Sequence, residues 1–220
     1  MGCCGVAHAG ASLEVCFNYG CASAVPVILD DDRLATAGEV LHGASDAVTE
    51  RTAIARAVGM LHRLAGEQTP IVADRAGNFL DNGVDGRMDC IDHSTNTTRF
   101  LELMAARGWL RFHRVLPPAR RALLIFQHFS AAIEELDVPL AEAPVSPPVA
   151  IPDYVATMLA LCDCSEVLAE IAPAEHAQTL LRQAEPGARF VVDSWFVDHG
   201  EPAVVLPLAE WLNGEGPNVQ

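Results

Sequence analysis

The sequence predicts an α+β fold in which a helix packs against an antiparallel β-sheet. Apolar residues recur at helical spacing in the first half of the chain, most clearly over residues 48–64. Strand-like runs rich in β-branched and aromatic residues come later: "WLRFHRVLP", "ALLIFQHFSAAIEEL" and "ARFVVDSWFV". Half of the 220 residues are hydrophobic, so the chain can bury one substantial core without help from a metal or a disulfide.

Residues 1–12 are predicted to be a flexible start or the remnant of a signal peptide. They are small and uncharged, and Ala7-His8-Ala9 resembles the site at which secretory signals are cleaved. The basic and apolar regions of such a signal are missing from this segment. The Ala7-His8-Ala9 pattern favours a periplasmic or secreted protein, and a cytoplasmic location is the alternative.

Residues 13–65 are predicted to form a hairpin and two helices that belong to the same domain as the rest. Within them, residues 13–29 combine β-forming residues with a glycine turn, and Pro26 suggests an edge position for the second strand. Cys16 and Cys21 flank that turn, so they can form a disulfide in an oxidising compartment.

Residues 66–220 are predicted to be the catalytic core, with an insertion at residues 137–188. The core opens with a long loop rich in Gly, Asp and Asn, and a helix then begins near Asp89 or Cys90. The insertion has a Pro-rich opening followed by Ala- and Leu-rich helical stretches. We expect it to separate two strands that are neighbours in the sheet.

The charge and hydropathy of the chain exclude two classes of partner. The net charge is −15, from 29 acidic and 14 basic residues, which argues against a nucleic-acid partner because little would neutralise a phosphate backbone. No stretch approaches the roughly 20 apolar residues that a membrane-spanning helix needs. A peptide or protein substrate is compatible with both observations, and the oligomeric state stays open.

Three polar residues, Cys90, His128 and Asp193, interrupt segments where packing alone would favour other residues. At a helix start, unsatisfied N–H groups and the positive end of the helix dipole favour a thiolate, which is the form that a nucleophilic Cys90 needs. A strand histidine can take the thiol proton, and an aspartate can orient that histidine. Taken singly, the residues have plainer interpretations: a small apolar residue, a hydrogen-bonded strand histidine and a turn cap.

A zinc site is the alternative for this segment. Asp92 or His93 would join Cys90, with His128 and Asp193 as further ligands. The Cys90-x-x-His93 spacing lacks a second ligand pair at metal spacing, so we expect neither a metal nor another cofactor.

The order of these residues and the elements that carry them resemble the transglutaminase-like superfamily of cysteine enzymes, which shares its Cys-His-Asp layout with papain-like proteases. The corresponding segments are "MDCIDHSTNTTRFLELMAARG", "HFSAAIEE" and "FVVDSWF". The compact bacterial branch is the most similar, over about residues 66–200 apart from the insertion. His128 is followed by Phe129-Ser130 where that family has a small residue and Trp.

The resemblance implies a catalytic triad that performs acyl chemistry on an amide through a thioester on Cys90. By analogy with papain-like enzymes, Gln68 would assist the backbone N–H of Cys90 in stabilising the oxyanion, while Asp89 and His93 would cap and support the nucleophile. It implies a hydrolase of the thiol protease kind, or an acyltransferase that uses an amine. The rival hypothesis is a catalytically silent binding module that grips a partner with its insertion.

Overall fold

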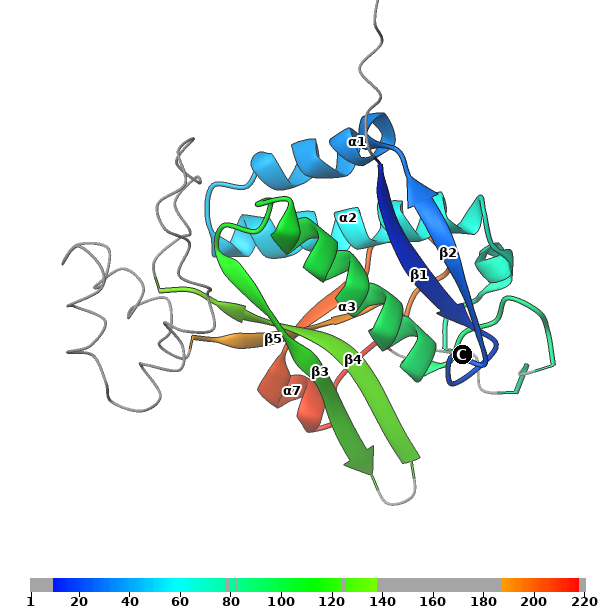
Figure 1. The fold of residues 1–220 in the computed structure, drawn as a ribbon. Helices are drawn as coiled ribbons and strands as arrows, with labels where there is room; N and C mark the ends of the chain where they lie inside the picture. Colours follow the sequence, from blue (N-terminus) through cyan, green and yellow to red (C-terminus); the bar gives the residue numbers. More distant parts are fainter. Residues whose placement is uncertain (1–9, 78–79, 82, 124–125, 138–186, 218–220) are drawn as a thin grey trace, which may run out of the picture.

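The computed structural model describes residues 10–77, 80–81, 83–123, 126–137 and 187–217 (Figure 1). These residues form an α+β fold, as predicted, with a four-stranded antiparallel sheet, a separate two-stranded hairpin and the helices that pack on them. Residues 1–9 of the predicted flexible start and residues 138–186 of the predicted insertion lie outside the described residues. Within the described part, none of the helices has the length and apolarity to cross a membrane.

The hairpin and two helices come first along the chain, and most of the sheet comes after the helix that begins at Cys90. The elements are β1 (Ala11–Phe17), β2 (Ser23–Leu29), α1 (Asp31–His42), α2 (Ala47–Gly66), the 3-10 helix η1 (Pro70–Ala73), α3 (Cys90–Ala106), β3 (His113–Leu123), β4 (Phe126–Glu135), β5 (Arg189–Asp193), β6 (Val204–Pro207) and α7 (Leu208–Leu212). Helix α3 packs against β4, β3 and β1 (Figure 1). It buries Phe100, Leu101 and Met104 in the same core as Ile133 of β4 and Val192 of β5.

Strands β4 and β5 pair directly, although residues 136–188 separate them in the sequence. The antiparallel register sets Ala131 opposite Val192 and Ile133 opposite Phe190, in a sheet of order β3-β4-β5-β6. This pairing confirms that the two predicted strands are neighbours. It also brings the strand that carries His128 next to the strand that ends at Asp193.

Strand β3 extends beyond the predicted strand-like run, which ended at Pro117. The strand continues through Pro117 and Pro118 to Leu123, with a shift of register between Leu116 and Ala119. Proline lacks a backbone N–H, but β3 lies at the edge of the sheet, where one side of the strand has no ladder to complete.

The first turn of α3 is capped by its own acidic residues, as the predicted helix start requires. Asp89 is the N-cap, and its Oδ1 accepts hydrogen bonds from the backbone N–H groups of Ile91 and Asp92 at 3.0 Å each. Asp92 Oδ2 accepts in return from the Asp89 N–H at 3.2 Å. This reciprocal capping box fixes the helix start at Cys90.

Asn96 joins α3 to β1 by two buried hydrogen bonds. Its Oδ1 accepts from the backbone N–H of Cys16 at 2.7 Å, and its Nδ2 donates to the carbonyl oxygen of the same residue at 2.8 Å. The side chain is fully buried. The pair of bonds therefore sets the position of α3 along the hairpin.

Substitution of Asn96 by Ala should lower the free energy of unfolding by about 2–4 kcal/mol, because it leaves two buried backbone groups of Cys16 without partners. Urea denaturation measures the change. Glu102→Ala, at an exposed position of the same helix, is the matched control and should change stability by less than about 0.5 kcal/mol. Equal stabilities of the two variants would contradict the importance of this link.

Candidate active site

Cys90 is the first residue of α3 and is half-buried. Its Sγ lies 3.9 Å from the carbonyl oxygen of Gln127, the residue that precedes His128 in β4. The side chain also packs against a cluster of aromatic residues that includes Trp195, Phe196 and Trp211. The thiol therefore lies where the start of the helix meets the sheet.

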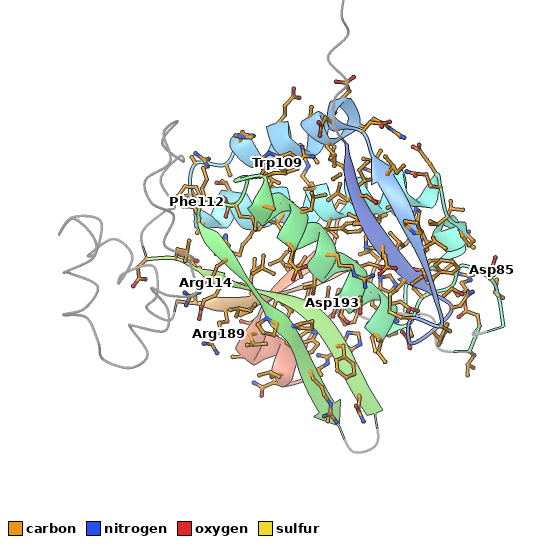
Figure 2. The ribbon with its side chains drawn as sticks, in the orientation of Figure 1. Asp85, Trp109, Phe112, Arg114, Arg189 and Asp193 are labelled. Atoms are coloured by element: carbon orange, nitrogen blue, oxygen red, sulfur yellow. A yellow bond between two sulfur atoms is a disulfide. The ribbon has the colours of Figure 1, made fainter. Side chains whose placement is uncertain are left out.

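His128 faces Asp193 across the sheet. Its Nε2–H donates a hydrogen bond of 2.7 Å to Asp193 Oδ2, and the carboxylate is only 1% exposed. The strand register places Ala131 opposite Val192, so Asp193 and His128 project from the same face of the sheet. Figure 2 shows Asp193 near the centre of the molecule, and its carboxylate lies on the face of the sheet that carries Val191 and contacts Trp211.

Both neighbours of His128 act on its protonation. Burial lowers the pKa of the ring, but hydrogen bonds with Asp193 and Cys90 and the negative charges of these groups outweigh it and raise the pKa to about 9. Because Nε2 is engaged by Asp193, Nδ1 is the ring nitrogen left to interact with Cys90. The structure thus brings together the three residues that the sequence predicted as a triad.

Two tryptophans complete the environment of Asp193. The backbone N–H of Trp195 donates to Oδ1 at 3.2 Å, and the indole Nε1–H of Trp211 donates to Oδ2 at 3.0 Å. The first bond is the turn-capping interaction that was the plainer interpretation of Asp193, and it coexists with the bond to His128. Sequence reasoning missed Trp211, since nothing in a helix beginning 15 residues after Asp193 marks it as a neighbour.

Aromatic rings enclose His128. The ring centroids of Trp195, Phe196 and Trp211 lie 4.9, 5.5 and 5.6 Å from that of His128. Arg121 holds Trp211 in place, since its guanidinium lies 4.7 Å from the ring centroid and donates to the Trp211 carbonyl oxygen at 2.6 Å. These apolar walls limit the access of water to the hydrogen bond between His128 and Asp193.

His93 supports the site from behind and does not pair with Cys90. Its Nδ1 hydrogen-bonds with Ser194 Oγ at 2.9 Å, and Thr97 Oγ1 contacts the same hydroxyl at 2.9 Å. Its Nε2 lies 2.9 Å from Asp74 Oδ2, although the two atoms are not aligned as a hydrogen bond. Since Ser194 follows Asp193, His93 ties the helix of the thiol to the end of β5.

The turn between β1 and β2 is hydrogen-bonded to the start of α3 through Asp92. The backbone N–H groups of Tyr19 and Cys21 both donate to its buried carboxylate, and a disulfide joins Cys16 to Cys21 across the turn. Burial raises the pKa of Asp92 to about 6, against the opposing effect of these amides and with a further increase from the charge of Asp89.

Gln68 does not contribute to the site, so this part of the prediction is wrong. Its Oε1 accepts from the Ile28 N–H at 3.0 Å and its Nε2 donates to the Ile28 carbonyl oxygen at 2.8 Å. The side chain completes the edge of β2 next to the end of α2. Both of its polar atoms are therefore used away from Cys90.

Asp92 and His93 have the partners described above, which removes them from the zinc alternative. Within the described part of the chain, no group of three or more His, Cys, Asp and Glu side chains is arranged to hold a metal ion.

Comparison of the chain with protein-family models, with curated proteins and with solved structures finds no match.

Substitution of Asp193 by Asn should lower the pKa of His128 clearly below about 9, because burial still lowers it while the charge of Asp193, one of the two groups that raise it, is lost. NMR titration of the ring Cε1–H measures the pKa. Asp198→Asn is the matched control, because that carboxylate accepts from the Ala76 N–H instead. A pKa of His128 that is unchanged in Asp193→Asn would contradict the assigned pair.

Proposed function

We propose that the protein is a cysteine enzyme that performs acyl chemistry on an amide, with Cys90 as nucleophile, His128 as acid and base, and Asp193 as the residue that orients His128. The observation that carries the proposal is the hydrogen bond between His128 Nε2 and the buried Asp193. It leaves Nδ1 of the same ring to interact with the thiol of Cys90 at the start of α3. Thiol enzymes use this arrangement of nucleophile, base and orienting group.

The reaction begins when the Cys90 thiolate attacks the carbonyl carbon of the amide. The carbonyl π electrons move to oxygen, and the backbone N–H of Cys90, which has no acceptor inside the helix, is a donor for the resulting oxyanion. The oxyanion then re-forms the carbonyl as the C–N bond breaks, and the His128 imidazolium gives its proton to the leaving amine. A thioester on Cys90 and a neutral His128 remain.

Acylation changes the protonation of His128 in the direction that the second half of the reaction needs. Part of the rise in its pKa comes from the hydrogen bond and the charge of Cys90, and both disappear when Sγ becomes a thioester. The pKa of His128 then falls, so the ring stays neutral and accepts a proton from the attacking molecule. His128 acts as an acid before acylation and as a base after it.

Water and an amine are both possible acceptors of the acyl group, and we propose water. Peptide or isopeptide hydrolysis is the activity implied by the resemblance to compact bacterial transglutaminase-like proteins, which look protease-like. The chain has no lysine, so it cannot serve as its own lysine acceptor. The disulfide between Cys16 and Cys21 supports a periplasmic or secreted location, where such bonds persist.

Alkylation with iodoacetamide at near-neutral pH tests the nucleophile. We expect Cys90 to react at least about tenfold faster than the other thiols of the native protein, because only a thiolate attacks the reagent rapidly. His128→Ala should slow the modification of Cys90 selectively, and His42→Ala, in the distant helix α1, is the control. Peptide mass spectrometry assigns each modified residue. Equal rates for Cys90 and the other accessible thiols would reject the enzyme and favour the silent binding module.

Turnover gives a second, independent test. With an amide substrate found by screening a peptide library, Cys90→Ala should lower kcat/KM by about 1000-fold or more, since it removes covalent catalysis altogether. The folded state should tolerate this change at a half-buried position, and thermal unfolding checks that it does. Retention of full activity by Cys90→Ala would contradict the thioester mechanism.

A further inference from the structure

A second cluster of histidines lies behind the candidate triad and is not used by the proposed reaction. A small, partly open cavity of about 10 Å³ is bordered by His62 of α2, His93 of α3 and His199 in the turn after β5. The ring centroid of His62 lies 6.0 Å from that of His93 and 6.2 Å from that of His199. Asp74, at the end of η1, completes the polar wall.

The rings around this cavity have nitrogen atoms that no protein group satisfies. His62 is 3% exposed, and neither of its ring nitrogens has a hydrogen-bond partner in the protein; the same is true of Nδ1 of His199. Buried polar groups in folded proteins nearly always have a partner, which is either protein or an ordered water. A cavity of this volume is about the size of one water molecule, and its walls offer the two to four polar partners that a buried water needs.

We propose that this cavity binds one water molecule shared by His62, His93 and His199, and that the cluster holds the Asp193–Ser194 corner until His62 takes up a proton. His62 is then a positioning residue that acts on the site through water and His93. The water site stands independently of the proposed reaction, whereas its effect on Cys90 rests on the proposed function.

The link to the triad runs through His93. One of its nitrogens borders the cavity, and the other hydrogen-bonds with Ser194, the residue that follows Asp193. A proton taken up by His62 would replace a neutral partner of the water with a cation, and the buried carboxylate at the wall, Asp74, lies 2.9 Å from His93. The cluster must then open to hydrate the charge, and the opening loosens the contact between His93 and Ser194.

The charged residues around the cluster do not fully offset the cost of protonating His62. Burial lowers the pKa of His62 well below its ordinary value, and the neighbouring His93 and His199 lower it further. Burial also lowers the pKa of His199, against the attraction of Asp74 and in concert with His93, Arg63 and Arg75. The remaining charged residues at the wall are Asp198 and Glu201.

The sign of the pH dependence follows from these lowered pKa values. The unfolded chain takes up protons near pH 6.5 and the folded chain does not, so stability that is present above pH 6.5 is lost as the pH falls below it. Asp92, with its pKa raised to about 6, acts in the opposite direction. Its stabilising contribution is present at low pH and is lost as the pH rises through 6. The raised pKa of His128 acts above pH 6.5.

The test therefore compares two proteins, so that Asp92 and His128 titrate equally in both. Glutamine in His62→Gln keeps hydrogen-bonding groups but does not titrate. We expect the unfolding constant of the wild type, divided by that of His62→Gln, to rise about fivefold between pH 6.5 and 5.5 in urea denaturation, because the unfolded chain takes up one proton with a midpoint near pH 6.5. His199→Asn gives the same comparison at a less buried position if His62→Gln does not fold. His42→Gln, at a ring that bonds Gly38 within α1, is the control and should leave the ratio constant.

Alkylation of Cys90 with iodoacetamide reports the effect on the site. At pH 7.5, Cys90 should react at the same rate in the wild type and in His62→Gln. At pH 5.5, Cys90 of the wild type should react several-fold more slowly than Cys90 of His62→Gln. An unreactive Cys90 in both proteins would refute the proposed function, while the unfolding ratio would still decide on the cavity.

An unfolding ratio that does not change with pH would overturn the proton-sensitive cluster. A rise in Tm with Zn²⁺ or Ni²⁺ in the wild type but not in His62→Gln would overturn the water in favour of a metal.

Discussion

The buried carboxylate of Asp193 accepts three hydrogen bonds, and the rest of the candidate site depends on them. The donors are His128, the Trp195 backbone and the Trp211 indole, which come from β4, the turn after β5 and α7. Without these donors an ionised carboxylate at 1% exposure would be costly to bury. The same interactions therefore satisfy the carboxylate of Asp193, fix the ring of His128 and hold α7 on the sheet.

The position of Cys90 depends on a different part of the chain. The disulfide-closed turn places Asn18, Tyr19, Gly20 and Cys21 in the left-handed region, with φ of 67°, 63°, 65° and 55°. Such a run is unusual for residues with side chains. It points two backbone N–H groups at Asp92, two residues after the thiol. The hairpin thus acts as an external cap for the helix start.

The fold class, the start of α3 and the three triad residues follow from local patterns that a single sequence carries. Asp89 before an amphipathic run marks a cap, and a polar residue within an apolar strand marks a site. Contacts that join distant segments leave no such pattern, which is why Trp211 and the cluster around His62 were missed. Gln68 was misjudged because order along the chain does not say which backbone a side chain meets. The continuation of β3 beyond Pro117 was missed because only an edge position permits two prolines within a strand.

The pairing of β4 with β5 has a consequence for the newly made chain. Cys90 and His128 leave the ribosome long before Asp193, because residues 136–188 must be synthesised between the two strands, and Trp211 follows later still. Contacts of such high sequence separation form late in folding. Until then His128 lacks its orienting carboxylate. The hydrogen bond between His128 and Asp193 therefore forms only when the sheet is complete.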